Sequence, residues 1–253
     1  MIKKLNSYFW LTFFPAHLLL ICTLINIKIN LYFIITLLIL WTLISGYGIG
    51  VGYHRLLSHK SFKTWYPVEI IITYFGCLAI QGSSIFWVNL HRGYHHPHAD
   101  MEQDIQSPKK GRLWAYLLWP ILIDYKMLKF DFVTDLFRKK MHRIFHYLYF
   151  PIIWLTWIAS YNFNKQFFFA LIMAQVIALH QEFCVNLFCH SGGGYRNFDL
   201  PDNSVNRNFF GMFFWGVGYH NNHHARPNEY NFAFKKNEFD PATILVKIIK
   251  KEK

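Results

Sequence analysis

The sequence predicts an all-α integral membrane protein: four transmembrane helices in two hairpins, with a cytoplasmic helical cap. Hydrophobic residues make up 53% of the 253 residues, aromatic residues 20% and charged residues only 16%, against about 25% charged residues in an ordinary soluble domain. The 26 lysines and arginines, which give a net charge of +12, lie between long apolar runs and not within them. This pattern favours a membrane protein with a basic face over a nucleic-acid-binding protein.

The first hairpin is predicted from two apolar runs near the N-terminus. They span 9–27 and 31–53, and a short polar turn that carries Lys28 separates them. Each run approaches the ~20 apolar residues that a helix needs to cross about 30 Å of hydrocarbon. The second run ends in glycines at every second position from 46 to 52. Small residues four apart let another helix or a substrate approach the backbone closely.

The second hairpin is predicted over 144–160 and 166–190. In its second arm Glu182, Asn186 and His190 stand four residues apart, so they form one stripe along a helix. Polar side chains within a membrane helix normally face the bundle and mark a site. We therefore expect this stripe to end at the functional site.

The apolar segment 67–90 is not expected to cross the membrane. Histidine clusters lie directly before and after it, ending at His59 and starting at His91. If both clusters serve one site, they lie on the same side, and a single crossing between them is excluded. We expect interfacial or re-entrant helices here, and an interfacial helix over the short apolar stretch 113–123.

The distribution of positive charge predicts the orientation. Of the lysines and arginines, only Lys28 and Lys165 fall in the two hairpin turns. All the others lie on the side of both termini and of the histidine clusters, which the positive-inside rule makes cytoplasmic. The cap is expected over 54–143 and 191–253, and 1–253 is expected to be a single domain.

Nine of the 14 histidines point to a metal site. His220, His223 and His224 lie at i, i+3 and i+4, so on a helix all three leave one face. His54 and His59 are offset by ~140° on an ideal α-helix and could flank one metal ion or contact two. Nine imidazoles exceed the ligands of one ion but suit two, and favour Zn, Fe, Cu or Ni. The nine are His54, His59, His91, His95, His96, His190, His220, His223 and His224.

Other metal chemistries fit less well. The chain has no HExxH motif and no carboxylate inside the three main clusters, which disfavours zinc-dependent hydrolysis. His91 and His95 are expected on one helical face outside the bundle, whereas haem ligands of membrane proteins usually lie within it. His17 and His180, the mid-span histidines, are expected to be hydrogen-bonded core residues.

The motifs HRLLSH, HRGYHH and GYHNNHH, in this order, resemble the three histidine boxes of the membrane fatty acid desaturases, above all the stearoyl-CoA or Δ9-type enzymes. The resemblance runs from Gly46 to Phe234 and includes Asp202-Asn203-Ser204 before the last box. It implies a di-iron centre held by the nine histidines, with Asn186 reaching a metal ion through water. It also implies that O2 and two electrons convert a saturated acyl chain to a cis-unsaturated one.

The resemblance further implies a closed, bent, apolar tunnel for the acyl chain. Thr42 and Leu43 are expected to limit its depth. Trp87, Lys109 and Lys110 are further candidate substrate residues. A separate ferredoxin or cytochrome b5-type protein is expected to supply electrons on the basic face, and the membrane is expected to be the cell inner membrane or the endoplasmic reticulum.

Departures from the family pattern leave the acyl carrier open. Three residues separate His91 from His95, where acyl-CoA desaturases usually have two. Asn89 and Leu90 precede the second box, where animal acyl-CoA desaturases have Arg-Asp, and Asp104-Ile105-Gln106 replaces the family's DPH. Acyl-CoA, acyl-lipid and acyl carrier protein all remain. The alternatives are a hydroxylase or ketolase of the same histidine-box type and, outside enzymes, a metal-transporting membrane protein.

Overall fold

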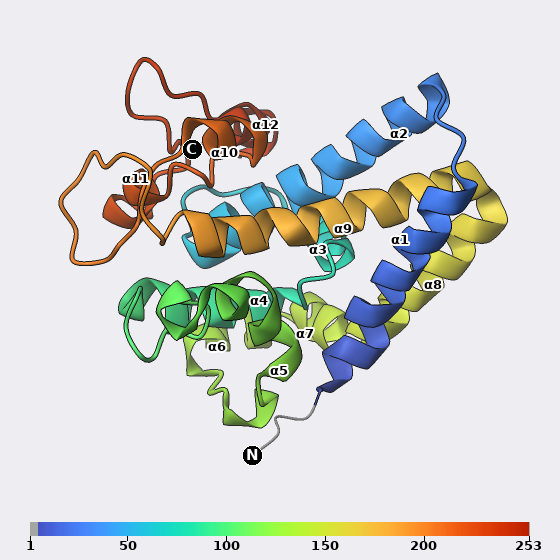
Figure 1. The fold of residues 1–253 in the computed structure, drawn as a ribbon, viewed down its shortest axis with the longest axis horizontal. Helices are drawn as coiled ribbons and strands as arrows, with labels where there is room; N and C mark the ends of the chain where they lie inside the picture. Colours follow the sequence, from blue (N-terminus) through green and yellow to red (C-terminus); the bar gives the residue numbers. More distant parts are fainter. Residues whose placement is uncertain (1–4, 253) are drawn as a thin grey trace.

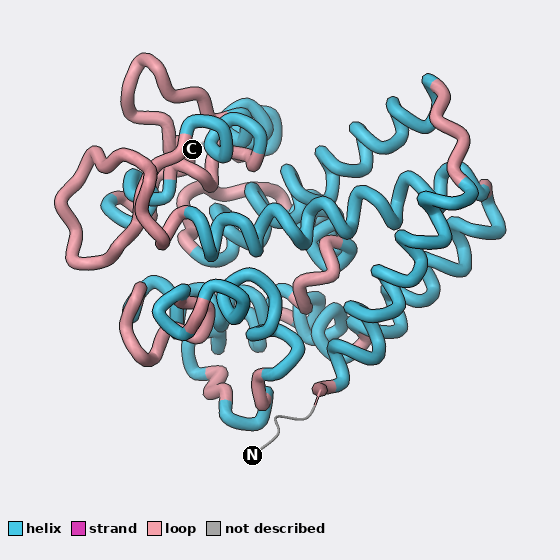
Figure 2. Tube along the Cα trace, in the orientation of Figure 1, coloured by secondary structure: helices cyan, strands magenta, loops and turns pink. Residues whose placement is uncertain are grey.

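The structure, a computed structural model, describes residues 5–252 as helices joined by loops (Figures 1 and 2). Within this range there is no β-strand, only isolated bridges that join Asn206 to Tyr195 and to Tyr219. The all-helical class expected from the sequence is therefore confirmed for the described residues.

Three helices are long and apolar enough to cross a membrane. They are Phe9–Asn26 (η1 Phe9–Phe13 and α1 Phe14–Asn26), Leu31–Ser58 (α2 Leu31–Trp41 and η2 Thr42–Ser58) and α9 Lys165–Phe188. They match three predicted spans, although the second runs beyond the expected end at 53. As a result His54 lies on the long helix and not in the cap. α9 packs against α1, α2 and α8 (Figure 1).

The predicted span 144–160 is not one helix. α7 covers Lys140–Tyr147 and α8 covers Tyr149–Phe163, and Leu148 between them leaves helical geometry at φ −99° and ψ 16°. The 15 residues of α8 cover about 22 Å, less than the ~30 Å of a hydrocarbon core. The second hairpin therefore pairs a short helix with a long one.

Asparagines start the second helix of each hairpin. The side chain of Asn30 accepts a hydrogen bond from Phe33 N at 2.9 Å, and that of Asn164 accepts one from Phe167 N at 3.0 Å. Such capping satisfies backbone N–H groups that have no partner inside the helix. The polar turns noted in the sequence thus mark real helix starts.

The segment 67–90 does not form a single crossing, as expected. α3 covers Tyr66–Leu78 and α4 covers Ser84–Leu90. The turn between them contains Ile80 at φ +53° and Gly82 at φ +99°, which ends helical geometry. The stretch 113–123 is also helical, as η6 Trp114–Leu118 and α5 Trp119–Leu122.

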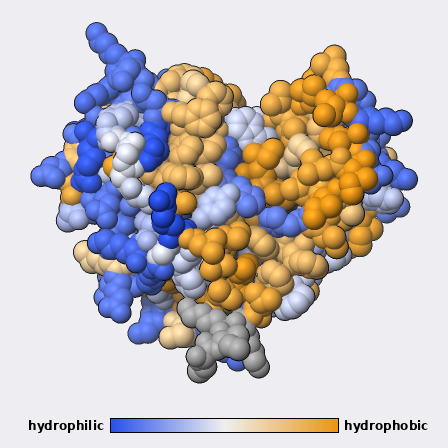
Figure 3. All heavy atoms as spheres, viewed as in Figure 1, coloured by the Kyte–Doolittle hydropathy of each residue, from blue (hydrophilic) through white to orange (hydrophobic). Residues whose placement is uncertain are grey.

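Short helices complete the segments predicted to form the cap. They are η3 His91–His95, η4 His96–His98, η5 Pro108–Lys110, η7 Tyr125–Met127, η8 Asp131–Val133, α6 Thr134–Arg138, α10 Asn208–Phe213, α11 His220–Ala225 and α12 Pro241–Ile249. Figure 3 shows hydrophobic residues gathered over the long helices and hydrophilic residues over the side that carries α11.

Candidate metal centre

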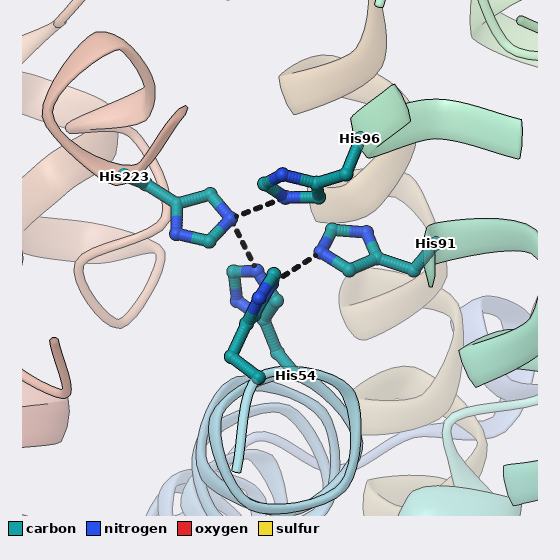
Figure 4. Close-up of side chains that lie close together, drawn as sticks. His54, His91, His96 and His223 are labelled. Carbon is teal, nitrogen blue, oxygen red and sulfur yellow. Dashed lines mark hydrogen bonds between the residues drawn. The ribbon is translucent and has the colours of Figure 1, made fainter. Parts of the chain in front are cut away.

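All nine histidines singled out in the sequence lie in two groups whose ring nitrogens converge. Within each group, one nitrogen of every ring lies within 4.8 Å of the others. Figure 4 shows the labelled rings of His54, His91, His96 and His223 pointing toward one another. The five-histidine group consists of His54, His59, His91, His96 and His223, and the four-histidine group consists of His95, His190, His220 and His224.

In the five-histidine group the Nε2 atoms face one another. His223 Nε2 lies 2.9 Å from that of His54 and 2.8 Å from that of His96. His59 Nε2 lies 2.8 Å from His91 Nε2. Adjacent ligands at right angles around an ion with bonds of about 2.1 Å are about 3.0 Å apart. The spacing therefore fits nitrogens that share one metal ion, whose charge would offset the repulsion between facing lone pairs.

The four-histidine group shows the same pattern. His220 Nε2 lies 3.1 Å from His224 Nε2. His190 Nε2 is buried and has no hydrogen-bond partner in the described part of the chain. A buried polar atom without a partner is costly, so a metal ion bound here would satisfy it.

π-helical turns decide which histidines share a group. His59 N donates to His54 O at 3.1 Å, an i→i+5 bond at the end of η2, and His96 N donates to His91 O at the end of η3. In both turns the residues five apart join one group. His91 and His95, expected on one α-helical face, fall in different groups because η3 is π-helical.

Burial keeps rings of the site neutral. It lowers the pKa of His59 to about 3, and the charges of Arg55 and Arg92 lower it further. It also lowers the pKa values of His91 and His223 well below the usual value. Neutral imidazole is the form that binds metal ions, so these rings are ready to ligate at neutral pH.

Aspartates bind the outer nitrogens of the four-histidine group. Burial alone would raise the pKa of Asp104, but its contact with His95 lowers it. Burial would also lower the pKa of His95, yet Asp104 raises it. The Nδ1–Oδ2 contacts are His95–Asp104 at 3.1 Å, His190–Asp100 at 2.9 Å and His224–Asp202 at 2.9 Å.

The asparagines of GYHNNHH hold the loop around α11 in place. Asn222 Oδ1 accepts from Asn206 Nδ2 at 2.8 Å, and Asn222 Nδ2 donates to Glu238 Oε2 at 2.9 Å. Asn221 Oδ1 accepts from Phe198 N at 2.8 Å. Both asparagines are fully buried, so they position the histidines of this motif.

The stripe on α9 leads to the site. Glu182 lines a cavity that His91 also lines. Asn186 is buried, and its Nδ2 has no hydrogen-bond partner among the described residues. His190 follows just beyond the end of α9 at Phe188. These positions agree with the expected role of Asn186, which stays a prediction.

The cavity beside His91 has a volume of about 20 Å³, room for about one water molecule. Trp87 forms part of its wall and stacks on His91, with ring centroids 4.9 Å apart. A second cavity of about 250 Å³ shares the wall residues Tyr8, Phe86 and Tyr125. With its side chains as they lie, the cavity beside His91 is too small to hold an acyl chain.

The other predicted substrate residues lie farther from this cavity or on the surface. Thr42 and Leu43 are not among its lining residues, and Thr42 Oγ1 donates to Leu38 O at 2.8 Å. Lys109 and Lys110 are exposed on η5. Their roles stay predictions.

The mid-span histidines pair with each other outside both groups. His17 Nε2 lies 3.1 Å from His180 Nε2, and His17 Nδ1 bonds to Phe13 O at 2.7 Å. His180 Nδ1 lies 2.9 Å from the hydroxyl of Tyr116. Both are hydrogen-bonded, as expected, but they are half-buried and do not lie in the fully buried core.

Comparisons with known proteins give the family. A model described as fatty acid desaturase matches residues 30–232. An sn-2 palmitoyl-lipid 9-desaturase of Nostoc sp. (strain 36) is 36% identical over 202 residues, covering 76% of this chain and 69% of the relative. Delta-9 acyl-lipid desaturase 2 of Arabidopsis thaliana is 36% identical over 187 residues, covering 72% of this chain and 60% of the relative. A probable acyl-CoA desaturase of Schizosaccharomyces pombe is 31% identical over 220 residues, covering 81% of this chain and 44% of the relative.

A helical membrane protein with two groups of converging histidines is thus matched along most of its length by one family. The chain belongs to the fatty acid desaturase family. The relatives named above are acyl-lipid and acyl-CoA desaturases, which are oxidoreductases.

Proposed function

We propose that this chain is an oxidoreductase that introduces a cis double bond at the Δ9 position of a saturated acyl chain. The convergence of nine imidazoles in two groups is the observation that carries the proposal. Two iron ions bound by these groups would supply, with O2, two electrons and two protons, the chemistry that removes two hydrogens from the chain and forms two waters. The names of two relatives support the Δ9 position.

The chain's own residues position the substrate. Trp87 stacks on His91 and forms, with Leu179 and Phe183, an apolar wall of the cavity. Methylene groups held against this wall lie beside the metal ligands, and such positioning supplies part of the rate acceleration. Asn186 is proposed to hold a water ligand in the four-histidine group.

We propose an acyl-lipid as the carrier. Asn89, at the position where animal acyl-CoA desaturases have an arginine, is fully buried and donates to Lys129 O at 2.8 Å. It is therefore not free to contact a CoA group. Two relatives are named as acyl-lipid desaturases, and acyl-CoA or acyl carrier protein would be the contrary outcomes. Electrons are proposed to come from a separate ferredoxin or cytochrome b5-type protein.

The protein is proposed to lie in the cell inner membrane or the endoplasmic reticulum, with the histidine groups and both termini on the cytoplasmic side. Only Lys28 and Lys165 lie in the two hairpin turns, and the concentration of all other lysines and arginines on the opposite side supports this orientation. The apolar surface over the long helices (Figure 3) is the part in contact with lipid.

The function is tested by expressing the chain in a host of known lipid composition and analysing its fatty acids by mass spectrometry. We expect a new Δ9 cis-monounsaturated acid in the lipid fraction. His190→Ala should abolish it, whereas His98→Ala, outside both groups, should retain it. A hydroxylated or ketone product would favour the alternative oxidation, and unchanged fatty acids with well-folded protein would contradict the proposal.

A further inference from the structure

The outer nitrogens of the two histidine groups have different partners. In the four-histidine group, His95, His190 and His224 each meet an aspartate through Nδ1 at 2.9–3.1 Å. The fourth ring, His220, meets Val217 O through Nδ1 at 3.2 Å. Every outer nitrogen of this group therefore has an oxygen acceptor, and three of the four acceptors are carboxylates.

The five-histidine group has no such support. Within the part of the chain that the structure describes, histidine–carboxylate contacts within 4.0 Å involve none of its members. The Nδ1 atoms of His54 and His223 are buried without any hydrogen-bond partner among the described residues. The charges that surround the two groups are therefore unequal.

The three aspartates are themselves fixed. Asp100 Oδ2 accepts from Asn203 N at 2.8 Å, and Asp104 Oδ1 accepts from Gln106 N at 3.0 Å. Asp202 Oδ1 accepts from Ser204 N at 2.8 Å. Backbone N–H groups hold each carboxylate in place, so its distance to the histidine ring is set by the loops.

The chemistry of this arrangement favours a bound cation in one group. A carboxylate that accepts a hydrogen bond from Nδ1–H makes the other ring nitrogen, Nε2, a stronger metal ligand. It also fixes the tautomer and the orientation of the ring. Three negative charges close behind the ligands add long-range attraction for a cation, which is strong where solvent is excluded. The number of ligands alone would make the five-histidine group the tighter site. The aspartates have the opposite effect and would make the four-histidine group the tighter site.

We propose that Asp100, Asp104 and Asp202 are positioning residues that make the four-histidine group the tighter of two unequal metal sites. The inference rests on the proposed function only in that both groups bind metal. It predicts that the ion held by His95, His190, His220 and His224 binds first and leaves last.

The test uses the full chain in detergent, stripped with a chelator and titrated with Fe(II) alone under anaerobic conditions. We expect two binding steps, of which His190→Ala removes the tighter and His59→Ala the weaker. Asp202→Asn and Asp104→Asn should weaken the tighter step by about 10- to 100-fold and leave the weaker step unchanged. Asp131→Asn, the same charge change on an exposed aspartate, should alter neither.

Mössbauer spectra of the iron-57 protein separate this role from a merely structural one. Two quadrupole doublets are expected, and Asp202→Asn should shift only the doublet that His190→Ala abolishes. Asp202→Glu should restore part of the affinity. Equal sites, or loss of the weaker step in the aspartate variants, would overturn the inference. Fatty acid analysis tests the proposed function separately. An active desaturase with two equal metal sites would contradict only this inference, whereas an inactive protein with two unequal sites would contradict only the proposed function.

Discussion

Arg55 stands next to His54 and forms a buried ion pair with Asp240. The nitrogen–oxygen distance is 2.8 Å, and both side chains are 0% exposed. Arg55 Nε also donates to Tyr230 O at 2.8 Å, and Asp240 Oδ2 accepts from Phe232 N at 2.9 Å. The pair thereby joins the helix of the first histidine box to the C-terminal segment.

Removing one member of this pair should be costly. Asp240→Asn leaves the guanidinium of Arg55 buried without a counter-ion, and we expect a loss of about 3–5 kcal/mol of stability. Thermal unfolding of the detergent-purified protein measures it. Asp131→Asn should unfold like the wild type, and equal unfolding temperatures for both variants would contradict the assigned role.

The metal-binding histidines could be predicted from the sequence, but the aspartates that contact them could not. The nine histidines could be found because several imidazoles at helical spacing are typical of a metal site. Asp100 could not be found, because a lone carboxylate in a loop has no periodic signal, and its contact with His190 depends on the tertiary fold. Asp104 and Asp202 stood out only through the family resemblance, which did not show what they contact.

At the scale of elements, Gly48 allows η2 to lie directly against α3. A Cβ atom at Gly48 would lie 2.6 Å from the backbone nitrogen of Gly76. The expected close approach at the glycine run therefore involves a neighbouring helix. At Gly50 the nearest atom would be a side-chain atom, Cβ of Trp215, at 3.2 Å.

Alanine substitutions should separate these two positions. Gly48→Ala forces backbone apart and should cost about 1–3 kcal/mol, whereas Gly50→Ala needs only a small shift of Trp215. The unfolding temperatures of the two variants give the comparison. A Gly50→Ala variant that is the less stable of the two would refute the packing described here.

A surface ion-pair network joins the end of η2 to η3 and α6. Asp135 lies 2.9 Å from Lys60 and 2.9 Å from Arg92. Burial alone would raise the pKa of Asp135, but Arg92 and Lys60 lower it to about 2. Because the unfolded value is about 3.9, the stabilising effect is present above about pH 4 and is lost as the pH falls toward 2.

The sign of this effect gives a pH test. The wild type should unfold at a higher temperature than Asp135→Asn at pH 6, and the difference should shrink between pH 4 and pH 3. The exposed Asp199→Asn variant should show little difference at any pH. A gap between wild type and Asp135→Asn that widens in acid would have the wrong sign.

The elements that sequence patterns missed are those that depart from α-helical geometry. An α-helix would set His54 and His59 apart by ~140°, but the π-helical end of η2 brings both into one group. The spacing of apolar residues does not distinguish an i→i+4 from an i→i+5 turn. The two turns differ in which backbone N–H and C=O groups are hydrogen-bonded, and side-chain polarity does not reveal this. The same reason explains the division of His91 and His95.

At the scale of the whole molecule, the sequence defined the bundle better than its interior. Long apolar runs carry their own signal, so three spans matched to within a few residues apart from the longer end of the second at Ser58. The break at Leu148 and the small cavity beside His91 depend on how side chains from several helices meet. Neither can be inferred from composition along the chain.

The orientation of the molecule has a direct test. Asn162 is exposed near the second hairpin turn, and Lys236 is exposed near the C-terminus. In a bacterial host that inserts the chain into its inner membrane, and with the native cysteines changed to serine, Asn162→Cys should react with a membrane-impermeant thiol reagent applied outside intact cells. Lys236→Cys should react only after permeabilisation. The reverse pattern would place the histidine groups on the outer side.

The nine histidines are proposed to bind two metal ions. This proposal is tested by the iron content of the purified, iron-loaded protein, measured by inductively coupled plasma mass spectrometry. The two groups predict two iron ions per chain for the wild type. His98→Ala should keep both, and His223→Ala should lose iron. One iron or less in the folded wild type, or equal loss from His98→Ala, would contradict the assignment of these groups as a di-iron centre.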